Sequence, residues 1–515
     1  MGIIQRTKEL LQRMNIIKGV KDKFSADVRL PDCESFYRDI EYWKKVYTCD
    51  KSGKDWLSTK SKSISNPSGK KRTRDELGMA KILCSELAEL IFNEECRINV
   101  SSDSEQTKKD LQDYVNKALQ RGAFWSKFQT HVEYMLALGG AYVKVLIVDG
   151  KPTLNYVMAD FAVPTGWNER GITEAVFISQ EKRDRWYYTL LEWHELKTVT
   201  NEEGEKSLHR VIKYNLYRAS DADLLGVEVS DIQSIYPDLE SPLEIDKDVD
   251  TFAHMRPNTA NNVDYTLPLG ISVFANAVDT IKQLDVAYDS FGREFKLGKK
   301  RIIVPSSAIR EVTGLGMTKP ARYFDADDEA YEAFNQDDRD NLQIQDNTTT
   351  LRVEEHVMAI NALLNILCMQ VGLTPGTFSF DQASGLRTAT EIISANSKTY
   401  KTIRSHQNLI REAIESVVGS IIDYGQLYKD LPAGLEYEVS IAFDDSIATD
   451  SNTEIDNAIK LTTAGLKSKT QAMIDLYGYT EEQAKTELAR IDDEQMLEAA
   501  DIIDMFGREG AVDNG

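Results

Sequence analysis

The chain has 515 residues, of which 42% are hydrophobic and 28% are charged, and its formal net charge is −22. This length exceeds what one hydrophobic core supports, so we expect three or four structural units. Tight nucleic-acid binding needs clustered Lys and Arg that displace counterions, so the acidic balance argues against a protein that recognises DNA sequence.

The sequence shows neither a targeting signal nor a cysteine pattern that would indicate a function. No stretch of 18 uncharged apolar residues occurs, so the sequence predicts no transmembrane helix. The N-terminus lacks the pattern of a secretory signal, which argues against secretion. The five cysteines have no CxxC spacing, which is typical of reduced cytosolic thiols and disfavours a disulfide scaffold or a zinc site.

Helices dominate the prediction for the first 140 residues. Before them, the Ser-, Lys- and Arg-rich segment Ser58–Arg74 is interpreted as a solvated loop, with a phosphate or partner contact as the alternative. Apolar residues at helical spacing then predict helices over Asp75–Asn93, Glu105–Arg121 and from Phe124 toward Leu138.

From Ala141 the hydrophobic pattern becomes extended. The apolar run Tyr142–Val148 leads into Asp149-Gly150 and then Leu154–Val157, which predicts a β-hairpin. Further strands are expected at Ala175–Ser179, Trp186–Trp193 and His209–Tyr217, with a turn at Asn201–Gly204. An antiparallel meander attached to a helical layer makes this part an α+β domain.

Two helices with heptad-like apolar stripes follow a turn-rich connection. They are predicted over Gly270–Leu297 and Leu351–Val371, and each stripe needs a packing partner. Together with the insert between them they suggest a stalk with a tip. The stripe residues that we expect to pack are Phe274, Ile281, Leu284, Tyr288 and Phe291 on the first helix, and Val357, Ile360, Leu364 and Leu367 on the second.

The remaining chain is mostly helical. Thr388 and Glu391 form a capping box that starts a helix running to about Tyr428, and a strand at Leu435–Phe443 is expected to return to the earlier sheet. A second capping box at Thr480 and Gln483 precedes an acidic helical end.

No common catalytic motif is present. The sequence contains no HExxH, no GxxxxGK[ST] and no GxSxG, so we predict no catalytic residues, no cofactor and no enzymatic activity. Acidic clusters at 325–340 and 444–450 are interpreted as solvated surfaces, with a divalent metal site as the alternative.

The order of these elements resembles that of tailed-phage portal proteins, and most closely the portals of siphophages that infect Gram-positive bacteria. The local phrases that carry the resemblance are Cys368–Pro375, the helix start Thr388–Ile393 and the helix-containing segment Glu76–Val100. The resemblance covers nearly the whole chain.

This resemblance implies a multidomain α+β portal fold with an α+β wing, a two-helix stem, a small α/β clip, a long wing helix and a helical crown. The implied boundaries are 1–266 for the N-terminal part of the wing, 267–297 for the first stem helix, 298–350 for the clip, 351–372 for the second stem helix, 373–387 for a tunnel loop, 388–449 for the long helix and return strand, and 450–515 for the acidic crown.

The resemblance also implies a function and partners. Portals of this kind form rings, usually dodecamers, at one capsid vertex, and double-stranded DNA is packaged and ejected through them without sequence-specific contacts. They serve as the head–tail connector and dock the large terminase subunit, the head–tail adaptor, and major capsid and scaffolding proteins. The implied location is the virion, after assembly in the host cytoplasm, with no membrane. The alternatives are another virion structural protein, such as a minor head or adaptor protein, and a carboxylate- or metal-dependent enzyme.

Two groups of residues follow from the implied channel. An acidic wall would repel phosphates and let a duplex slide. The tunnel loop would contain Thr374, Pro375, Gly376, Asp381, Gly385 and Arg387, and a basic ring at the junction of stem and clip would contain Lys296, Lys299, Lys300 and Arg301. These cations would touch DNA or, alternatively, form salt bridges with the acidic cluster at 325–340.

Overall fold

The computed structural model places two compact units, Met1–Ala383 with Lys398–Phe443, and Ser384–Ser397 with Asp444–Gly515. The residues described are 34–49, 51, 54–63, 66–93, 96–102, 104–169, 171–200, 206–222, 224–237, 239, 241–245, 249–298, 302–305, 311–312, 321–322, 331–334, 345–346, 350–380, 389–443, 451–477 and 484–491.

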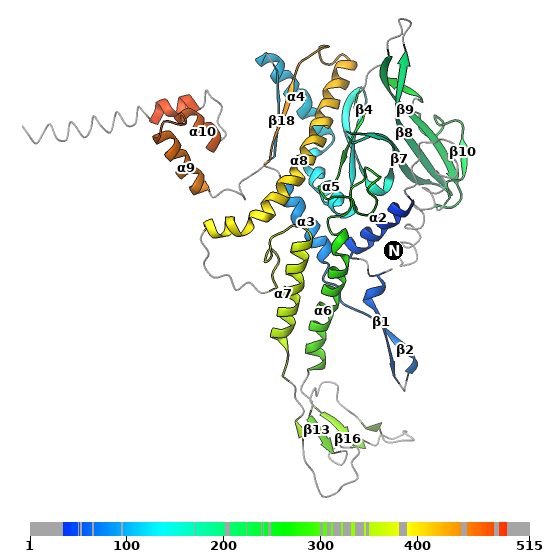
Figure 1. Ribbon diagram of the computed structural model, residues 1–515. Coiled ribbons are helices and arrows are strands. Elements are labelled where there is room, and N and C mark those ends of the chain that lie inside the picture. Colours follow the sequence, from blue (N-terminus) through cyan, green and yellow to red (C-terminus); the bar gives the residue numbers. More distant parts are fainter. Residues whose placement is uncertain are drawn as a thin grey trace, which may run out of the picture. The chain divides into compact units, whose positions relative to one another are not determined.

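Four helices form the first layer of the larger unit (Figure 1). Leu83, Leu87 and Ile91 are buried at i, i+4 spacing, so one face of α3 enters the core. This helix begins at Met79 and not at Asp75 as predicted, because Gly78 has a left-handed φ of 71° immediately before it. The four helices are α2 (Glu34–Tyr47), α3 (Met79–Ile91), α4 (Glu105–Arg121) and α5 (Phe124–Leu138).

The predicted hairpin is confirmed. β4 (Ala141–Val148) pairs with β5 (Lys151–Met158) in antiparallel register, and Asp149 and Gly150 both have positive φ, as a two-residue type I′ turn requires. β12 (Phe252–Met255), within the segment predicted to be turn-rich, adds a third strand beside β4.

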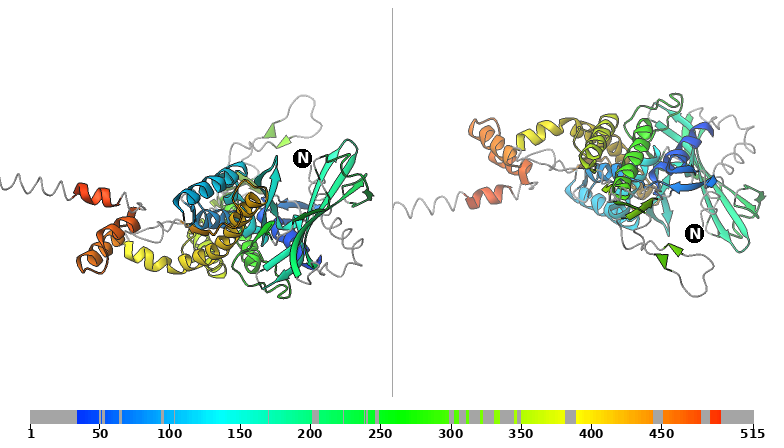
Figure 2. Two further views of the ribbon diagram at one scale, coloured as in Figure 1. Left: turned by 90° about the horizontal axis from the view of Figure 1, so that it is seen from above. Right: turned by 90° about the horizontal axis from the view of Figure 1, so that it is seen from below.

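The predicted meander is a six-stranded antiparallel sheet, separate from the hairpin sheet. The two sheets pack through Tyr142, Phe177 and Phe252, and Figure 2 shows the long strands from above and below. The strand order is β10-β9-β8-β7-β6, with β11 paired to β9. The strands are β6 (Ala162–Asn168), β7 (Gly171–Arg183), β8 (Trp186–Thr200), β9 (Lys206–Ala219), β10 (Val227–Val229) and β11 (Leu243–Ile245).

The interpretation of Ser58–Arg74 as a loop is wrong. After a 3-10 turn at Asp55–Leu57, this segment forms an antiparallel hairpin of β1 (Ser58–Ser63) and β2 (Asn66–Thr73). Its alternation of small polar and cationic residues carries no apolar face, which is why hydrophobic periodicity did not reveal the strands.

The two stripe helices are α6 (Val278–Leu297) and α7 (Val353–Gln370), which run side by side (Figures 1 and 2). The first begins later than the predicted Gly270. A Cβ atom on Gly270 would lie 2.4 Å from the Gly139 carbonyl oxygen. The chain therefore passes α5 in close backbone contact before a 3-10 turn leads into α6.

Within the 298–350 insert, the elements that the structure describes are all short strands. The insert was predicted to be α/β, and its described residues contain no helix. β13 pairs in parallel with β16 and antiparallel with β17, and β14 pairs with β15. The strands are β13 (Ile302–Pro305), β14 (Glu311–Val312), β15 (Ala321–Arg322), β16 (Tyr331–Phe334) and β17 (Gln345–Asp346).

The predicted long helix is α8 (Ala389–Leu427), and Ile403, Ile410 and Ile414 of its stripe are buried. The prediction for the next strand is wrong in one respect. β18 (Glu438–Ala442) does not join the meander but pairs with β3 (Arg97–Ser101) in a two-stranded sheet.

The smaller unit contains two helices that pack on each other, α9 (Ser451–Thr463) and α10 (Lys469–Tyr477). The capping boxes predicted at Thr388 and Thr480, the Asn201–Gly204 turn, both acidic clusters and the acidic end from residue 492 on lie outside the described residues. In the part of the chain that is described, no helix has both the length and the apolar character to cross a membrane.

Candidate functional site: a helix pair with three kinds of face

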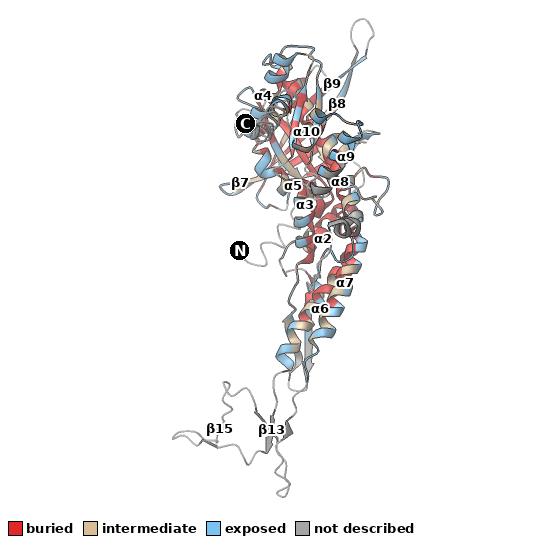
Figure 3. Cartoon of the chain, turned by 90° about the vertical axis from the view of Figure 1, so that its left-hand side faces the viewer, coloured by how far each residue is buried: buried red, intermediate tan, exposed pale blue. Residues whose placement is uncertain are grey.

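The predicted stripes of α6 and α7 meet each other within one chain. Their upper residues enter the core, whereas the end of α6 after Asp289 and the start of α7 before Ile360 are half-buried or exposed (Figure 3). Phe274, Ile281, Leu284, Ile360, Leu364 and Leu367 are buried, and Tyr288, Phe291 and Val357 are half-buried.

An ion pair closes the helix pair at the end where the insert begins. Glu294 of α6 accepts hydrogen bonds from Arg352 through the backbone N–H at 3.2 Å, Nε at 3.2 Å and Nη2 at 3.0 Å. His356 Nε2 lies 3.6 Å from the same carboxylate. The side-chain bonds from Arg352 lower the pKa of Glu294 to about 2, so this carboxylate is charged at neutral pH.

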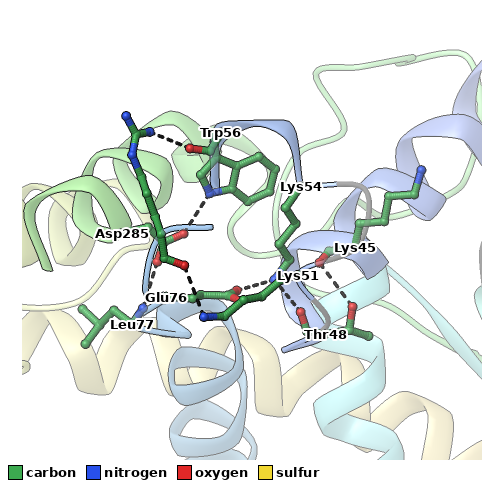
Figure 4. A network of polar contacts seen from close by, with 9 residues as sticks. Lys45, Thr48, Lys51, Lys54, Trp56, Glu76, Leu77 and Asp285 are labelled. Atoms are coloured by element: carbon green, nitrogen blue, oxygen red, sulfur yellow. Dashed lines mark hydrogen bonds and ion pairs between the residues drawn. The ribbon is translucent and has the colours of Figure 1, made fainter. Parts of the chain in front are cut away.

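A second face of α6 binds the segment that precedes α3 (Figure 4). Asp285 is buried and accepts from Trp56 Nε1 at 2.9 Å and from the backbone N–H of Leu77 at 3.0 Å. Burial raises the pKa of Asp285, although these two hydrogen bonds oppose the rise. Nearby, Lys54 pairs with Glu76 in the same network.

Asp289 continues this face one turn further along α6. It accepts from the backbone N–H of Asp75 at 3.0 Å and pairs with Arg72 at the end of β2. Burial alone would raise the pKa of Asp289, but the bonds from Asp75 and Arg72 outweigh it and hold this pKa below its usual value. The β1–β2 hairpin is therefore fastened to α6.

The outer face of α7 is apolar but exposed. The exposed fractions are 63% for Met358, 40% for Ile366 and 52% for Met369, and Ala362 between them is also exposed. The spacing of 4, 4 and 3 places these four side chains on one side of the helix, opposite the stripe that faces α6. A soluble helix rarely leaves such a continuous apolar stripe in water unless another surface covers it.

The first half of the predicted tunnel loop is hydrogen-bonded to α7 and α8. Gly372 has a φ of 82° and ends α7, with the N–H of Leu373 donating to the Cys368 carbonyl at 2.7 Å, as in a Schellman motif. Asn365 and Asn361 of α7 then accept from the backbone N–H groups of Gly376 and Phe380 at 2.8 and 2.7 Å.

Two side chains of α8 hold the start of the same loop. Thr399 Oγ1 accepts from the backbone N–H of Thr374 at 2.9 Å, and Thr402 donates to the Gly372 carbonyl at 2.6 Å. The Phe380 ring lies edge-on to Phe291, with centroids 5.6 Å apart. Thr374 is thus bound to α8 and Gly376 to α7, Pro375 between them is exposed, and Asp381, Gly385 and Arg387 lie outside the described residues.

Of the four residues predicted to form the basic ring, only one is among the described residues. Lys296 is exposed in the last turn of α6, and Lys299, Lys300 and Arg301 fall outside the described residues. No group of three or more His, Cys, Asp or Glu side chains that could hold a metal ion occurs in the described ranges.

Sequence reasoning missed two features of this site. Asp285 and Asp289 have the i, i+4 spacing of one helix face, but nothing in the sequence distinguishes them from solvated charges. The outer stripe of α7 has no distinct signal, because apolar residues lie on both faces of this helix and the heptad spacing marks only the inner one.

Comparison with known proteins identifies one family. The sequence profile of the phage portal proteins described as SPP1 Gp6-like matches residues 28–499. No curated protein matches the chain. Among solved structures, a chain from the neck of an empty GTA particle, computed with C6 symmetry, is 12% identical over 77% of this chain and 89% of that chain, with a TM-score of 0.41. A chain from the neck of a native GTA particle, computed with C12 symmetry, has the same identity and coverage and a TM-score of 0.37.

Proposed function

The chain belongs to the SPP1 Gp6-like family of phage portal proteins, and from this premise we propose that it forms a closed ring through which double-stranded DNA is packaged and ejected. The family is structural and non-enzymatic, and its members are components of the virion particle. The ring, a dodecamer in this proposal, sits at one capsid vertex. It docks the large terminase subunit during packaging and the head–tail adaptor afterwards, and it contacts capsid and scaffolding proteins.

The observation that carries the proposal is the exposed apolar stripe of α7. The opposite face of this helix is already packed on α6, so the stripe of Met358, Ala362, Ile366 and Met369 can be covered only by another surface. A second copy that meets it with a different face makes a head-to-tail contact, and such contacts close into rings when the rotation between copies allows.

The parts of the chain take these roles in the proposal. The α+β layers of the larger unit form the wing, α6 and α7 the stem, the 298–350 insert the clip, and the smaller helical unit the crown. The chain after Phe380, with Asp381, Gly385 and Arg387, reaches toward the duplex. Lys296 belongs to a basic ring at the lower end of the stem.

The charge of the chain suits a conduit. A formal charge of −22 on each copy, repeated around a ring, gives a strongly negative wall that repels the DNA phosphates. A duplex that is held off the wall can slide during packaging.

Charged substitutions in the α7 stripe test this proposal. In Met358→Asp/Ile366→Asp, the carboxylates would have to be buried without partners in the subunit contact, so we expect folded monomers and no rings. Mass photometry and negative-stain microscopy measure assembly, and circular dichroism measures folding. The control is Val227→Asp, at an even more exposed apolar residue on β10, which should still form rings. Stripe variants that assemble as readily as the native chain would refute the assigned contact.

A further inference from the structure

The β1–β2 hairpin is a basic feature on an acidic chain. Residues 58–74 contain Lys and Arg but neither Asp nor Glu, although the whole chain has 83 acidic residues against 61 basic ones. Most of the other residues of the two strands are Ser and Thr, which can donate hydrogen bonds. The cations of this segment are Lys60, Lys62, Lys70, Lys71, Arg72 and Arg74.

The register places like charges opposite each other. Lys60 pairs with Lys71, and both are exposed. Like charges directly opposite on two strands repel each other, and a two-stranded hairpin without an apolar face has little stability of its own. An anionic surface laid against this pair would remove the repulsion and stabilise the hairpin.

The base of the hairpin is fixed to α6 on the side away from α7. Arg72 pairs with the buried Asp289, and Arg74 Nη1 donates to the Trp56 carbonyl at 2.6 Å. In Figure 1 the hairpin runs alongside the lower half of α6, with α7 on the other side of that helix. The hairpin and the acidic start of α7 in the same chain therefore lie on opposite sides of α6.

That acidic start is the complementary surface. Glu354 and Glu355 are exposed in the first turn of α7, at the same end of the helix pair toward which the hairpin extends. Glu355 also lies on the side of the helix that carries Met358 and Ala362, and so continues the exposed stripe toward the insert.

We propose that the β1–β2 hairpin is a clasp between subunits, whose Lys60–Lys71 pair binds Glu354 and Glu355 of the next copy of this chain in the ring. This inference rests on the ring of the proposed function and specifies one of its contacts. We favour a second copy over DNA as the ligand of the hairpin. The net negative charge of the protein repels a DNA duplex. Local pairs of opposite charge between two protein surfaces can still form in a stereospecific interface.

Complementary charge reversals test the clasp. Lys60→Glu/Lys71→Glu leaves four acidic residues at each contact, and Glu354→Lys/Glu355→Lys leaves four basic ones. Each variant alone should raise the dissociation constant of the ring about tenfold, as expected for two exposed ion pairs lost and like charges opposed. An equimolar mixture of the two should return toward the native value, because alternating copies restore opposite charges at every contact.

Recovery on mixing separates a contact between chains from a contact within one chain, since an internal ion pair gains nothing from a partner. Lys109→Glu/Lys117→Glu on α4, with the same charge change at two exposed lysines, should leave the ring constant unchanged. Retention of duplex DNA by the assembled rings is measured in parallel.

Two results would overturn the clasp. One is that hairpin reversal leaves ring stability unchanged, or that mixing fails to restore it. The other is that reversal abolishes DNA retention by rings of native stability, which would make the hairpin a nucleic-acid contact. Absence of rings from the native chain is a different outcome, because it would refute the proposed function itself.

Discussion

Asp285 fastens α6 to the segment before α3, and its two acceptor oxygens serve two different donors, Trp56 Nε1 and the Leu77 N–H. Trp56 lies 229 residues away in the sequence. A helical aspartate with partners so distant cannot be recognised from local pattern, because its periodicity is that of a solvated residue. The apolar stripe beside it was predictable because burial follows the helical period directly.

Removing this carboxylate should destabilise the larger unit. Asp285→Ala leaves two donors without acceptors in a buried place, which should cost about 2 to 4 kcal/mol of unfolding free energy. Urea titration followed by tryptophan fluorescence measures the loss. Asp279→Ala, at an exposed aspartate in the first turn of α6, is the control and should change the free energy by less than about 1 kcal/mol. Equal effects of the two substitutions would contradict the assigned anchor.

Histidines whose pKa is lowered by burial of the ring make stability depend on pH. Burial lowers the pKa of His254 to about 3 and that of His406 to about 4, whereas the unfolded chain titrates near 6.5. In the neutral ring, His406 Nδ1 accepts from the Asn258 N–H at 3.0 Å. Since the folded pKa values are depressed, the unfolded chain takes up protons first, and stability is complete above about pH 6.5 and falls as the pH falls.

From pH 7 to pH 5 each of these histidines should cost about 2 kcal/mol of unfolding free energy. His406→Gln keeps a hydrogen-bond acceptor without a titrating group, so it should remove the contribution of this one histidine, about 2 kcal/mol, from the pH dependence. Asn116→Gln on an exposed face of α4, which changes no titrating group, serves as the control and should leave the slope unchanged. Urea titrations of all three proteins at the two pH values give the comparison, and a native chain equally stable at both would refute this account.

At the scale of elements, strong local sequence signals were sufficient to predict single helices and hairpins. Which distant strands pair with each other was not predictable. The Asp149-Gly150 turn identifies its hairpin, because both residues must adopt positive φ and this pair does so at little cost. The partner of β18 is β3, more than 300 residues earlier in the chain. A single apolar strand pattern does not say which of several edges it joins, so the predicted return to the meander was wrong.

The loop after α7 should loosen when its two helical anchors are removed. In Asn361→Ala/Asn365→Ala the N–H groups of Gly376 and Phe380 lose their acceptors, and the segment should open locally. Limited proteolysis should then cut between residues 374 and 390 several times faster, while the thermal midpoint of the whole protein stays nearly constant. Asn116→Ala, on an exposed face of α4, should show the native cleavage rate. Unchanged cleavage in the double variant would show that the asparagines do not hold the loop.

At the scale of the whole molecule, the order of elements predicted the family, and the profile match over residues 28–499 confirms it. The subunit contacts could not be predicted, because one sequence contains no information on which exposed face meets which. The outer stripe of α7 and the basic hairpin on the other side of α6 now supply two unlike faces. Unlike faces favour a head-to-tail ring over a two-fold dimer.

A symmetry count from single-particle images of the purified, full-length protein tests the central claim most directly. The account predicts closed rings of one cyclic symmetry with a central opening wide enough for a DNA duplex, and it predicts that these rings are lost in the Met358→Asp/Ile366→Asp variant. Images that contain only monomers and dimers under every assembly condition would contradict it.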